Sequence, residues 1–140
     1  VHRYRARISG PLMDRIDLQV EVPRVTYRAL KGEATGRSSG EILDRVLEAR
    51  EIQARRFRGT AIHTNAAMDG PLLREHAAPD PEGERVLEQA VERFGLSARA
   101  HARILKVART IADLEGSAGV LADHLAEAAQ YRSMDLDPFR

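Results

Sequence analysis

The stretch "LSARAHARILKVARTIADLEGS", Leu96–Ser117, predicts a helix with two different faces. Ser97 is a favourable N-cap residue, and Gly116 marks the end of the pattern because glycine is unfavourable inside a helix. Between them, apolar residues recur at intervals of three and four, the spacing of one face of an α-helix. The predicted inward face consists of Ala98, Ala102, Leu105, Ala108, Ile111 and Ala112. Such a face predicts a helix that packs against others in a bundle.

A second face of this helix is basic. Arg99, Arg103 and Lys106 fall within about 60° of one another around the helix axis, and no acidic residue occurs from Ser97 to Arg109. Arg99 lies in the first turn, where the helix dipole helps to attract an anion. The pattern alone leaves two interpretations open, a solvated basic face and a phosphate-binding face. For the second, Arg99 is the main candidate, and Arg103, Lys106 and Arg109 are weaker ones.

Start and stop signals predict more helices on both sides of this one. Ser38 and Glu41 have the spacing of a capping box, which predicts a helix running to about Phe57. Its predicted apolar face consists of Ile42, Leu43, Val46, Leu47 and Ala49.

Three further helices follow from the same kind of signal. Pro71 begins a short helix over residues 72–76, and Asp80 begins a longer one that Gly95 ends. Gly116 and Ser117 then break the chain before a last helix. The apolar positions of the last helix are Val120, Leu121, Leu125 and Ala128.

The N-terminal part has the alternating pattern of a β-strand. In "GPLMDRIDLQVEVP", Gly10–Pro23, apolar residues alternate with polar ones from Ile16 to Val22, which predicts a half-buried strand that Pro23 ends. Residues 24–37 contain two glycines and mixed polarity, which is typical of a linker. The predicted fold class is therefore mainly α, a helical bundle of four or five helices preceded by a short strand-bearing stub.

Three charged residues surround the start of the predicted strand. Asp14, Arg15 and Asp17 occupy a turn after Pro11. If the aspartates only neutralise the arginine, this is a local surface cluster of little energetic consequence. If Arg15 points away from the chain, it is available to another molecule.

Composition limits the function classes. The 140 residues suggest one domain, or one domain and a fragment of another. Aromatic residues make up only 4%, so the core must be aliphatic and rich in alanine. The net charge of +1 gives no general attraction to nucleic acid or to a membrane.

Several kinds of site are excluded or disfavoured. The absence of cysteine excludes disulfides and thiolate metal sites, and fits a reducing compartment. The five histidines are scattered without metal-ligand spacing, so no metal site is expected. No phosphate loop of the G-x-x-x-x-G-K-[ST] type is present. Because the chain begins at Val1 within a charged segment, we expect a piece of a longer protein.

Three stretches resemble one known family. "RYRARISGPLMDRIDLQVEVP", Arg3–Pro23, closely resembles the ComM/YifB family of magnesium-chelatase-like AAA+ ATPases. The stretch Leu96–Ser117 is similar to the last helical signature of that family, and "HLAEAAQYR", His124–Arg132, is similar to its C-terminal end. The three occur in family order and together span the chain.

The resemblance implies roles for several charged residues. It implies that residues 1–34 form the C-terminal edge of the AAA+ core and that residues 35–140 form the helical lid. Within the turn, Arg15 matches the arginine finger, which contacts the γ-phosphate of ATP bound to the neighbouring subunit, while Asp14 and Asp17 orient the turn. Arg99 matches the sensor 2 arginine, which contacts the nucleotide of its own site or of a neighbouring one.

The resemblance also implies ligands and partners. The full-length protein would use ATP and Mg²⁺, form a homo-oligomeric ring of six subunits in the cytoplasm, and couple hydrolysis to DNA remodelling such as branch migration in natural transformation. The chain alone would be inactive, because the Walker A and Walker B motifs are absent. Two alternatives remain at this point. One is a helical module that binds nucleic acid or protein through the basic face, and the other is a scaffold in which both arginines are structural.

Overall fold

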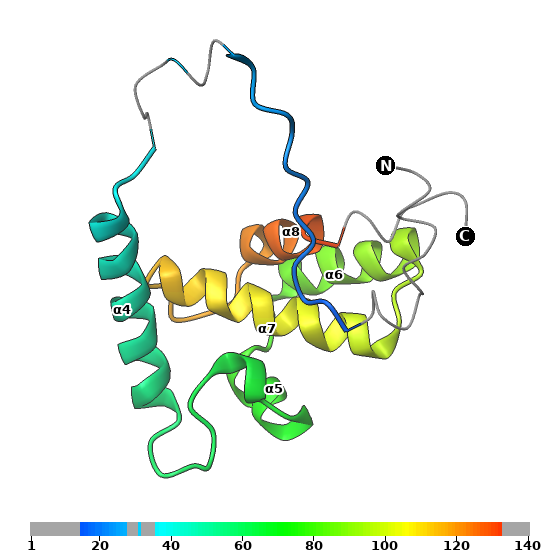
Figure 1. Cartoon of the computed structure of the whole chain (residues 1–140). Helices are drawn as coiled ribbons and strands as arrows, with labels where there is room; N and C mark the ends of the chain where they lie inside the picture. Colours follow the sequence, from blue (N-terminus) through cyan, green and yellow to red (C-terminus); the bar gives the residue numbers. More distant parts are fainter. Residues whose placement is uncertain (1–14, 28–30, 32–35, 133–140) are drawn as a thin grey trace.

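The computed structural model describes residues 15–27, 31 and 36–132, and most of this part is helical (Figure 1). Five α-helices and one 3-10 turn occur among these residues. In chain order they are α4 (Ser39–Arg56), η1 (Asn65–Ala67), α5 (Gly70–His76), α6 (Pro81–Phe94), α7 (Ala98–Leu114) and α8 (Ala122–Gln130). The mainly α fold class predicted from the sequence is confirmed.

Helix α7 is the centre of the bundle. It packs against α4, η1, α5 and α8, and α6 packs against α8. Ile104, Ala108 and Leu125 are at most 1% exposed and lie in one cluster of buried apolar residues. The remaining members of this core are Phe57, Met68, Leu73, Ala77, Leu87, Leu105, Ile111, Val120 and Ala128. The core is largely aliphatic, as the composition predicts.

Local signals determine where the helices begin and end. The Ser38 hydroxyl accepts a hydrogen bond from the backbone N–H of Glu41, and the Glu41 carboxylate accepts one from the backbone of Ser38, which is the predicted capping box. Asp80 and Ser97 cap α6 and α7 in the same manner. Gly95 ends α6 with φ at 57°, a left-handed conformation that favours glycine. These boundaries agree with the sequence prediction.

The predicted apolar face of α4 is mostly exposed. Ala49 is 4% exposed, whereas Ile42, Leu43, Val46 and Leu47 are 41–55% exposed. The reason is geometric, because α4 meets the bundle towards its C-terminal end and its first turns extend beyond α7 (Figure 1). Besides Ala49, which belongs to the predicted face, the buried residue of this helix is Gln53.

The predicted strand from Ile16 to Val22 is absent from the part of the chain that the structure describes. Residues 18–26 have no regular secondary structure and follow an extended path (Figure 1), and Gln19 donates its backbone N–H to the carbonyl of Tyr131 over 2.9 Å. A strand requires a neighbouring strand to complete its ladder of hydrogen bonds, and the segment contacts helices instead. The apolar residues of the alternating pattern are 38–81% exposed.

None of the described helices combines the length and the apolar character needed to cross a membrane. Asp14, which the sequence places in the charged turn, lies outside the described residues, as do the rest of residues 1–14.

Candidate functional site

The charged turn lies against the helical bundle through its backbone. The guanidinium of Arg103 on α7 donates to the carbonyl of Arg15 over 2.9 Å and also pairs with the carboxylate of Asp17. Arg132, just after α8, donates to the carbonyl of Ile16 over 2.6 Å. Three successive residues of the turn are therefore held by two arginines that are 88 or more positions away in the sequence.

The side chain of Arg15 takes part in none of these contacts. The residue is exposed, and its guanidinium pairs with none of the described residues. Asp17, which could have neutralised it, pairs with Arg103 instead. Arg15 is therefore an exposed cation that no described carboxylate neutralises.

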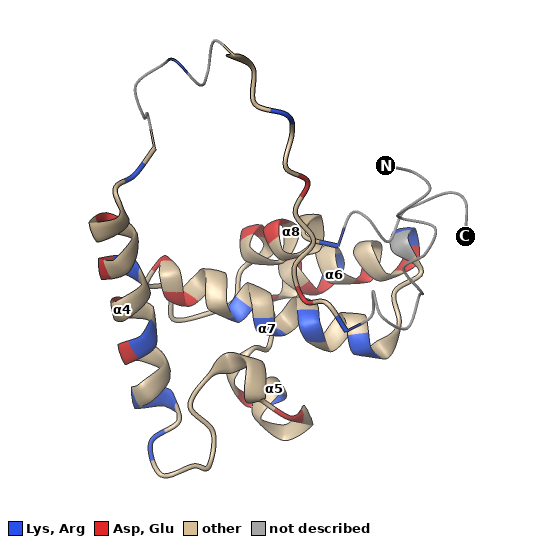
Figure 2. Ribbon diagram, viewed as in Figure 1, with Lys and Arg blue, Asp and Glu red and all other residues tan. Residues whose placement is uncertain are grey.

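Arg99 is exposed in the first turn of α7, one helical turn before Arg103. Its guanidinium has no hydrogen bond or ion pair within residues 15–27 and 36–132. Residues four apart lie on the same side of a helix, so Arg99 and the Arg103 contact to the turn share one side of α7. Figure 2 shows Lys and Arg positions along α7, and the start of the described N-terminal segment lies beside this helix.

The other basic residues of α7 are engaged within the chain. Lys106 donates to the carbonyl of Ala66 over 2.9 Å, and its partial burial and the charge of Arg103 lower the pKa of its ammonium group. Arg109 is 2% exposed and donates to the carbonyls of Ala118 and Ser117 over 2.9 and 2.6 Å. The basic face predicted from the sequence is therefore not a continuous free surface.

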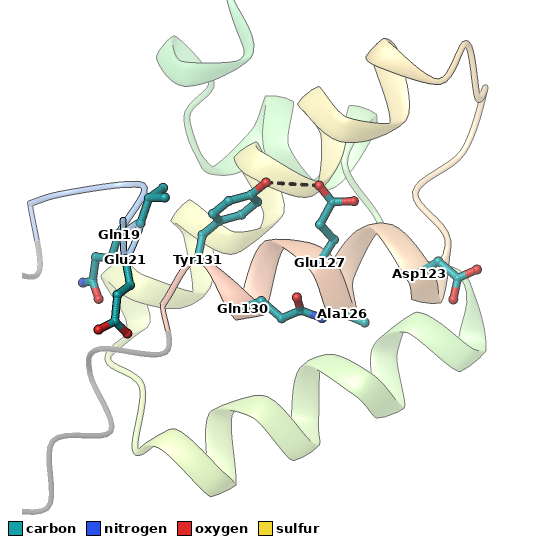
Figure 3. Close-up of a pocket in the computed structure, with 8 residues that line it drawn as sticks. Gln19, Glu21, Asp123, Ala126, Glu127, Gln130 and Tyr131 are labelled. Carbon is teal, nitrogen blue, oxygen red and sulfur yellow. Dashed lines mark hydrogen bonds between the residues drawn. The ribbon is translucent and has the colours of Figure 1, made fainter. Parts of the chain in front are cut away.

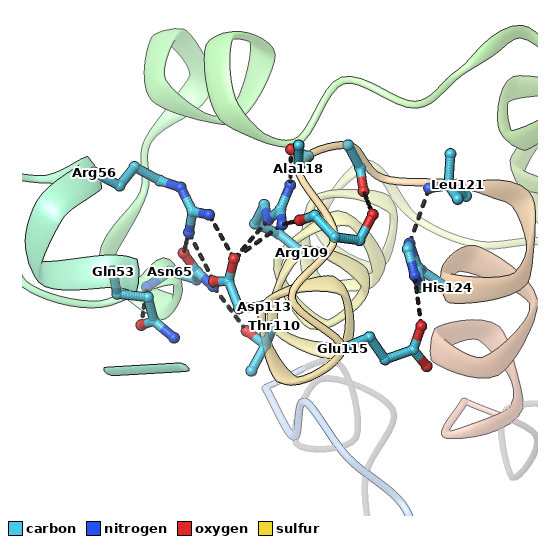
Figure 4. Close-up of polar contacts among 12 residues, drawn as sticks. Gln53, Arg56, Asn65, Arg109, Thr110, Asp113, Glu115, Ala118, Leu121 and His124 are labelled. Carbon is cyan, nitrogen blue, oxygen red and sulfur yellow. Dashed lines mark hydrogen bonds and ion pairs between the residues drawn. The ribbon is translucent and has the colours of Figure 1, made fainter. Parts of the chain in front are cut away.

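Arg109 belongs to a buried polar cluster centred on Asp113 (Figure 4). Arg56 donates to both carboxylate oxygens of Asp113 over 2.7 and 2.5 Å, Asn65 donates over 2.8 Å, and Arg109 donates over 3.1 Å. Burial raises the pKa of Asp113, but the hydrogen bonds from Arg56 and Asn65 and the two positive charges outweigh it, so the pKa lies below its ordinary value. This cluster joins α4, η1 and α7.

A groove lies between the N-terminal segment and α8 (Figure 3). Its described lining includes the carboxylates Glu21, Asp123 and Glu127 and contains no lysine or arginine. The Tyr131 hydroxyl donates to Glu127 over 3.3 Å, and burial together with the Glu127 charge raises the pKa of Tyr131. With this charge the groove is unsuited to phosphate. Of the candidates named from the sequence, Arg15 and Arg99 are exposed and pair with no described residue.

No metal-binding group is formed by the described residues, in that no cluster of three or more histidines and carboxylates could hold an ion.

Sequence reasoning missed four of the residues that organise this region: Arg56, Asn65, Asp113 and Arg132. The spacing of Arg109 and Asp113, four apart on one helix, was a usable signal of an ion pair. The contacts of Arg56, Asn65 and Arg132 join positions far apart in the chain, and no local pattern encodes them.

Comparison with known families identifies the family of the chain. A family model described as magnesium chelatase, subunit ChlI C-terminal, matches residues 36–132, which is most of the chain. The chain belongs to the magnesium chelatase family. A second model of the family, described as magnesium chelatase, subunit ChlI, matches residues 1–30. The resemblance inferred from the three sequence stretches is confirmed.

The chain is also similar to two bacterial proteins of greater length. The competence protein ComM of Haemophilus influenzae is 40% identical over 135 residues, which are 96% of this chain and 26% of ComM. The uncharacterized protein YifB of Escherichia coli is 41% identical over 134 residues, covering 95% of this chain and 26% of YifB. The chain thus spans about a quarter of the length of these relatives and corresponds to their C-terminal part.

Proposed function

We propose that the chain is the C-terminal lid and arginine-finger segment of an oligomeric magnesium-chelatase-like AAA+ ATPase. In this proposal residues 1–34 complete the ATPase core, and residues 35–140 form the lid. The observation that carries it concerns Arg15. Arg103 of α7 donates to the backbone carbonyl of Arg15, while the guanidinium of Arg15 is exposed and pairs with none of the described residues.

The chemistry follows from the guanidinium group. It is planar, permanently charged and able to donate two parallel hydrogen bonds, so it suits the oxygens of a phosphoryl group. A cation that meets the γ-phosphate from the neighbouring subunit stabilises the charge that develops during transfer, and hydrolysis then depends on assembly. Arg15 takes this role in a ring of identical subunits, and Asp14 and Asp17 orient its turn.

Arg99 takes the second role, as the sensor 2 arginine. Its position in the first turn of α7 adds the positive end of the helix dipole to its own charge. Arg103, Lys106 and Arg109 remain secondary candidates, and their contacts within the chain favour a supporting role over direct nucleotide contact.

Two exposed arginines of the described part, Arg15 and Arg99, supply cations for the phosphate end of ATP. Mg²⁺ is usually held by one or two carboxylates together with water and the phosphates, and no group of three or more metal ligands occurs among the described residues. In the full-length protein, the Walker motifs that the family has and this sequence lacks bind ATP and its ion. The chain by itself then has no ATPase activity.

The proposed output is DNA remodelling in the cytoplasm, including branch migration during natural transformation. The support is the likeness to ComM, which is named as a competence protein, together with the cysteine-free composition, which suits a reducing compartment. The alternative, a module that binds nucleic acid through the basic face of α7, has less support because Arg103, Lys106 and Arg109 are engaged within the chain.

The test is the ATPase rate of the full-length protein carrying Arg15→Ala. We expect turnover to fall by about 10³-fold or more, the range for loss of an arginine finger, while the dissociation constant for ATP stays within about threefold, a change of less than 1 kcal/mol. Arg24→Ala is the matched control, because Arg24 is exposed on the same segment and pairs with no described residue. Normal turnover in Arg15→Ala would contradict the proposal.

A further inference from the structure

The contact between Arg103 and the charged turn has a consequence for regulation. We propose that Arg103 is a positioning residue that links the lid helix α7 to the arginine finger, so that movement of α7 in one subunit sets the hydrolysis rate at the neighbouring site. This inference rests on the proposed function of Arg15 and names how that function is controlled.

Arg103 holds the turn through two contacts. One guanidinium donates to the carbonyl of Arg15 over 2.9 Å and pairs with the carboxylate of Asp17, two positions later. The two contacts fix the main chain of Arg15 and the position of Asp17 relative to α7. Because the bond to Arg15 involves its backbone, the side chain of Arg15 stays available to a neighbour.

Contacts with the end of α8 also hold the segment. Arg132 donates to the carbonyl of Ile16 over 2.6 Å, and Gln19 donates to Tyr131 over 2.9 Å. These contacts lead to the end of α8, whereas the contact at Arg15 leads to α7. Both ends therefore hold the turn, and the contacts of Arg103 are the ones that tie Arg15 and Asp17 to α7.

The ion pair between Arg103 and Asp17 contributes to the position of the turn more than to the stability of the bundle. The side chains of Arg103 and Asp17 are 26% and 51% exposed, and partly exposed ion pairs contribute little to folding. Arg109, by contrast, is 2% exposed and belongs to the buried cluster around Asp113. Loss of Arg103 should therefore loosen the turn and leave the bundle folded, which would be the behaviour of a positioning residue.

Binding of a phosphate at Arg99 is what displaces α7. Arg99 lies one helical turn before Arg103 on the same helix, and a helix transmits displacement as a rigid element. When Arg99 binds a phosphate, a shift of α7 is passed through Arg103 to the turn that presents Arg15. Binding and presentation are then coupled, and such coupling is reciprocal.

The experiment measures ATP turnover of the full-length protein carrying Arg103→Ala, Arg103→Lys or Asp17→Asn. We expect Arg103→Ala to lower kcat by about 10- to 100-fold, since a displacement of about 1 Å can cost this much. KM for ATP and the oligomeric state should stay unchanged, and the Hill coefficient for ATP should fall towards one. Arg103→Lys should recover only part of kcat, because an ammonium lacks the planar fork of donors.

Asp17→Asn tests the same link from the other partner. Asp17 lies on the exposed segment outside the bundle core, so its substitution cannot act by unfolding the lid. We expect a loss of kcat in this variant, and a double variant with Arg103→Ala should lose no more than the larger single effect. Arg50→Ala, an exposed arginine of α4, is the control and should retain wild-type turnover.

The outcomes are distinguishable. Wild-type kcat and cooperativity in Arg103→Ala, or wild-type kcat in Asp17→Asn, would overturn the inference even if Arg15→Ala abolishes turnover. Retained turnover in Arg15→Ala would instead overturn the proposed function on which the inference rests. A loss of kcat in both Arg103→Ala and Asp17→Asn at unchanged KM, with the Hill coefficient reduced, would support it.

Discussion

At the scale of single residues, helix α7 holds arginines in two opposite environments, one exposed and one buried. Arg99 is exposed and pairs with no described residue, whereas Arg109 is 2% exposed and is surrounded by acceptors. A buried guanidinium cannot lose its charge at ordinary pH, so it requires fixed partners. Asp113 and the carbonyls of Ser117 and Ala118 are those partners. Arg109 thereby ties the end of α7 to the loop that follows it.

Asp113→Ala should be strongly destabilising. It leaves the guanidinium groups of Arg56 and Arg109 without their shared carboxylate in a buried site, and breaking a buried pair in this way costs about 3–5 kcal/mol. The measurement is the free energy of unfolding of the chain from urea titration. The control is Glu51→Ala, which removes the exposed pair of Glu51 with Arg55 at 3.8 Å and should cost less than about 1 kcal/mol. Equal losses in the two variants would contradict this account of the cluster.

The same carboxylate predicts a pH dependence. The pKa of Asp113 is lower in the folded chain than its ordinary value of 3.8, so the unfolded state binds its proton first as the pH falls. Its contribution to stability is therefore complete above about pH 5 and is lost as the pH falls through 3.8 towards the folded-state pKa. Unfolding free energy measured from pH 6 down to pH 2.5 should decline more steeply in the wild type than in Asp113→Asn. Parallel curves would show that Asp113 does not titrate in this manner.

At the scale of elements, helix boundaries were predictable and helix partners were not. Caps such as Ser38 and Gly95 act within a few residues, so the sequence displays them directly. Periodicity shows which face of a helix is apolar, but it does not show what covers that face, and Ile42 on α4 is 52% exposed for this reason. The alternation from Ile16 to Val22 likewise describes side chains suited to a strand, while the strand itself depends on a neighbouring strand.

Gly83 is where two elements approach too closely for a side chain. A Cβ atom at this position of α6 would lie 2.7 Å from Cδ1 of Leu125 on α8 and 2.8 Å from Oδ1 of Asp80. Gly83→Ala should therefore destabilise the chain by about 1–3 kcal/mol, the usual effect of overpacking. Gly40→Ala is the matched control, because the nearest atom to its Cβ is 3.9 Å away, and it should stabilise the chain by about 0.4–1 kcal/mol. Thermal unfolding of both variants is the measurement, and a stabilising Gly83→Ala would be the contrary result.

At the scale of the whole molecule, the N-terminal segment is held against the helical bundle. Residues separated by 88 and 116 positions meet at the turn that carries Arg15. Family membership was accessible from the sequence, because the motifs that carry it are local, whereas the roles of Arg15 and Arg99 stay predictions. The tie through Arg103 and Arg132 was not, because it depends on how the segment lies across α7 and α8.

The central claim is that Arg15 serves the nucleotide site of a neighbouring subunit. The most direct measurement mixes full-length subunits carrying Arg15→Ala with full-length subunits that keep Arg15 but have an inactivated nucleotide site, and records ATP turnover after reassembly. Each variant alone should be inactive. The mixture should regain turnover, because an intact site then meets an intact Arg15 from the adjacent subunit. If differently labelled subunits show that mixed rings have formed and the mixture remains inactive, Arg15 does not act across the interface.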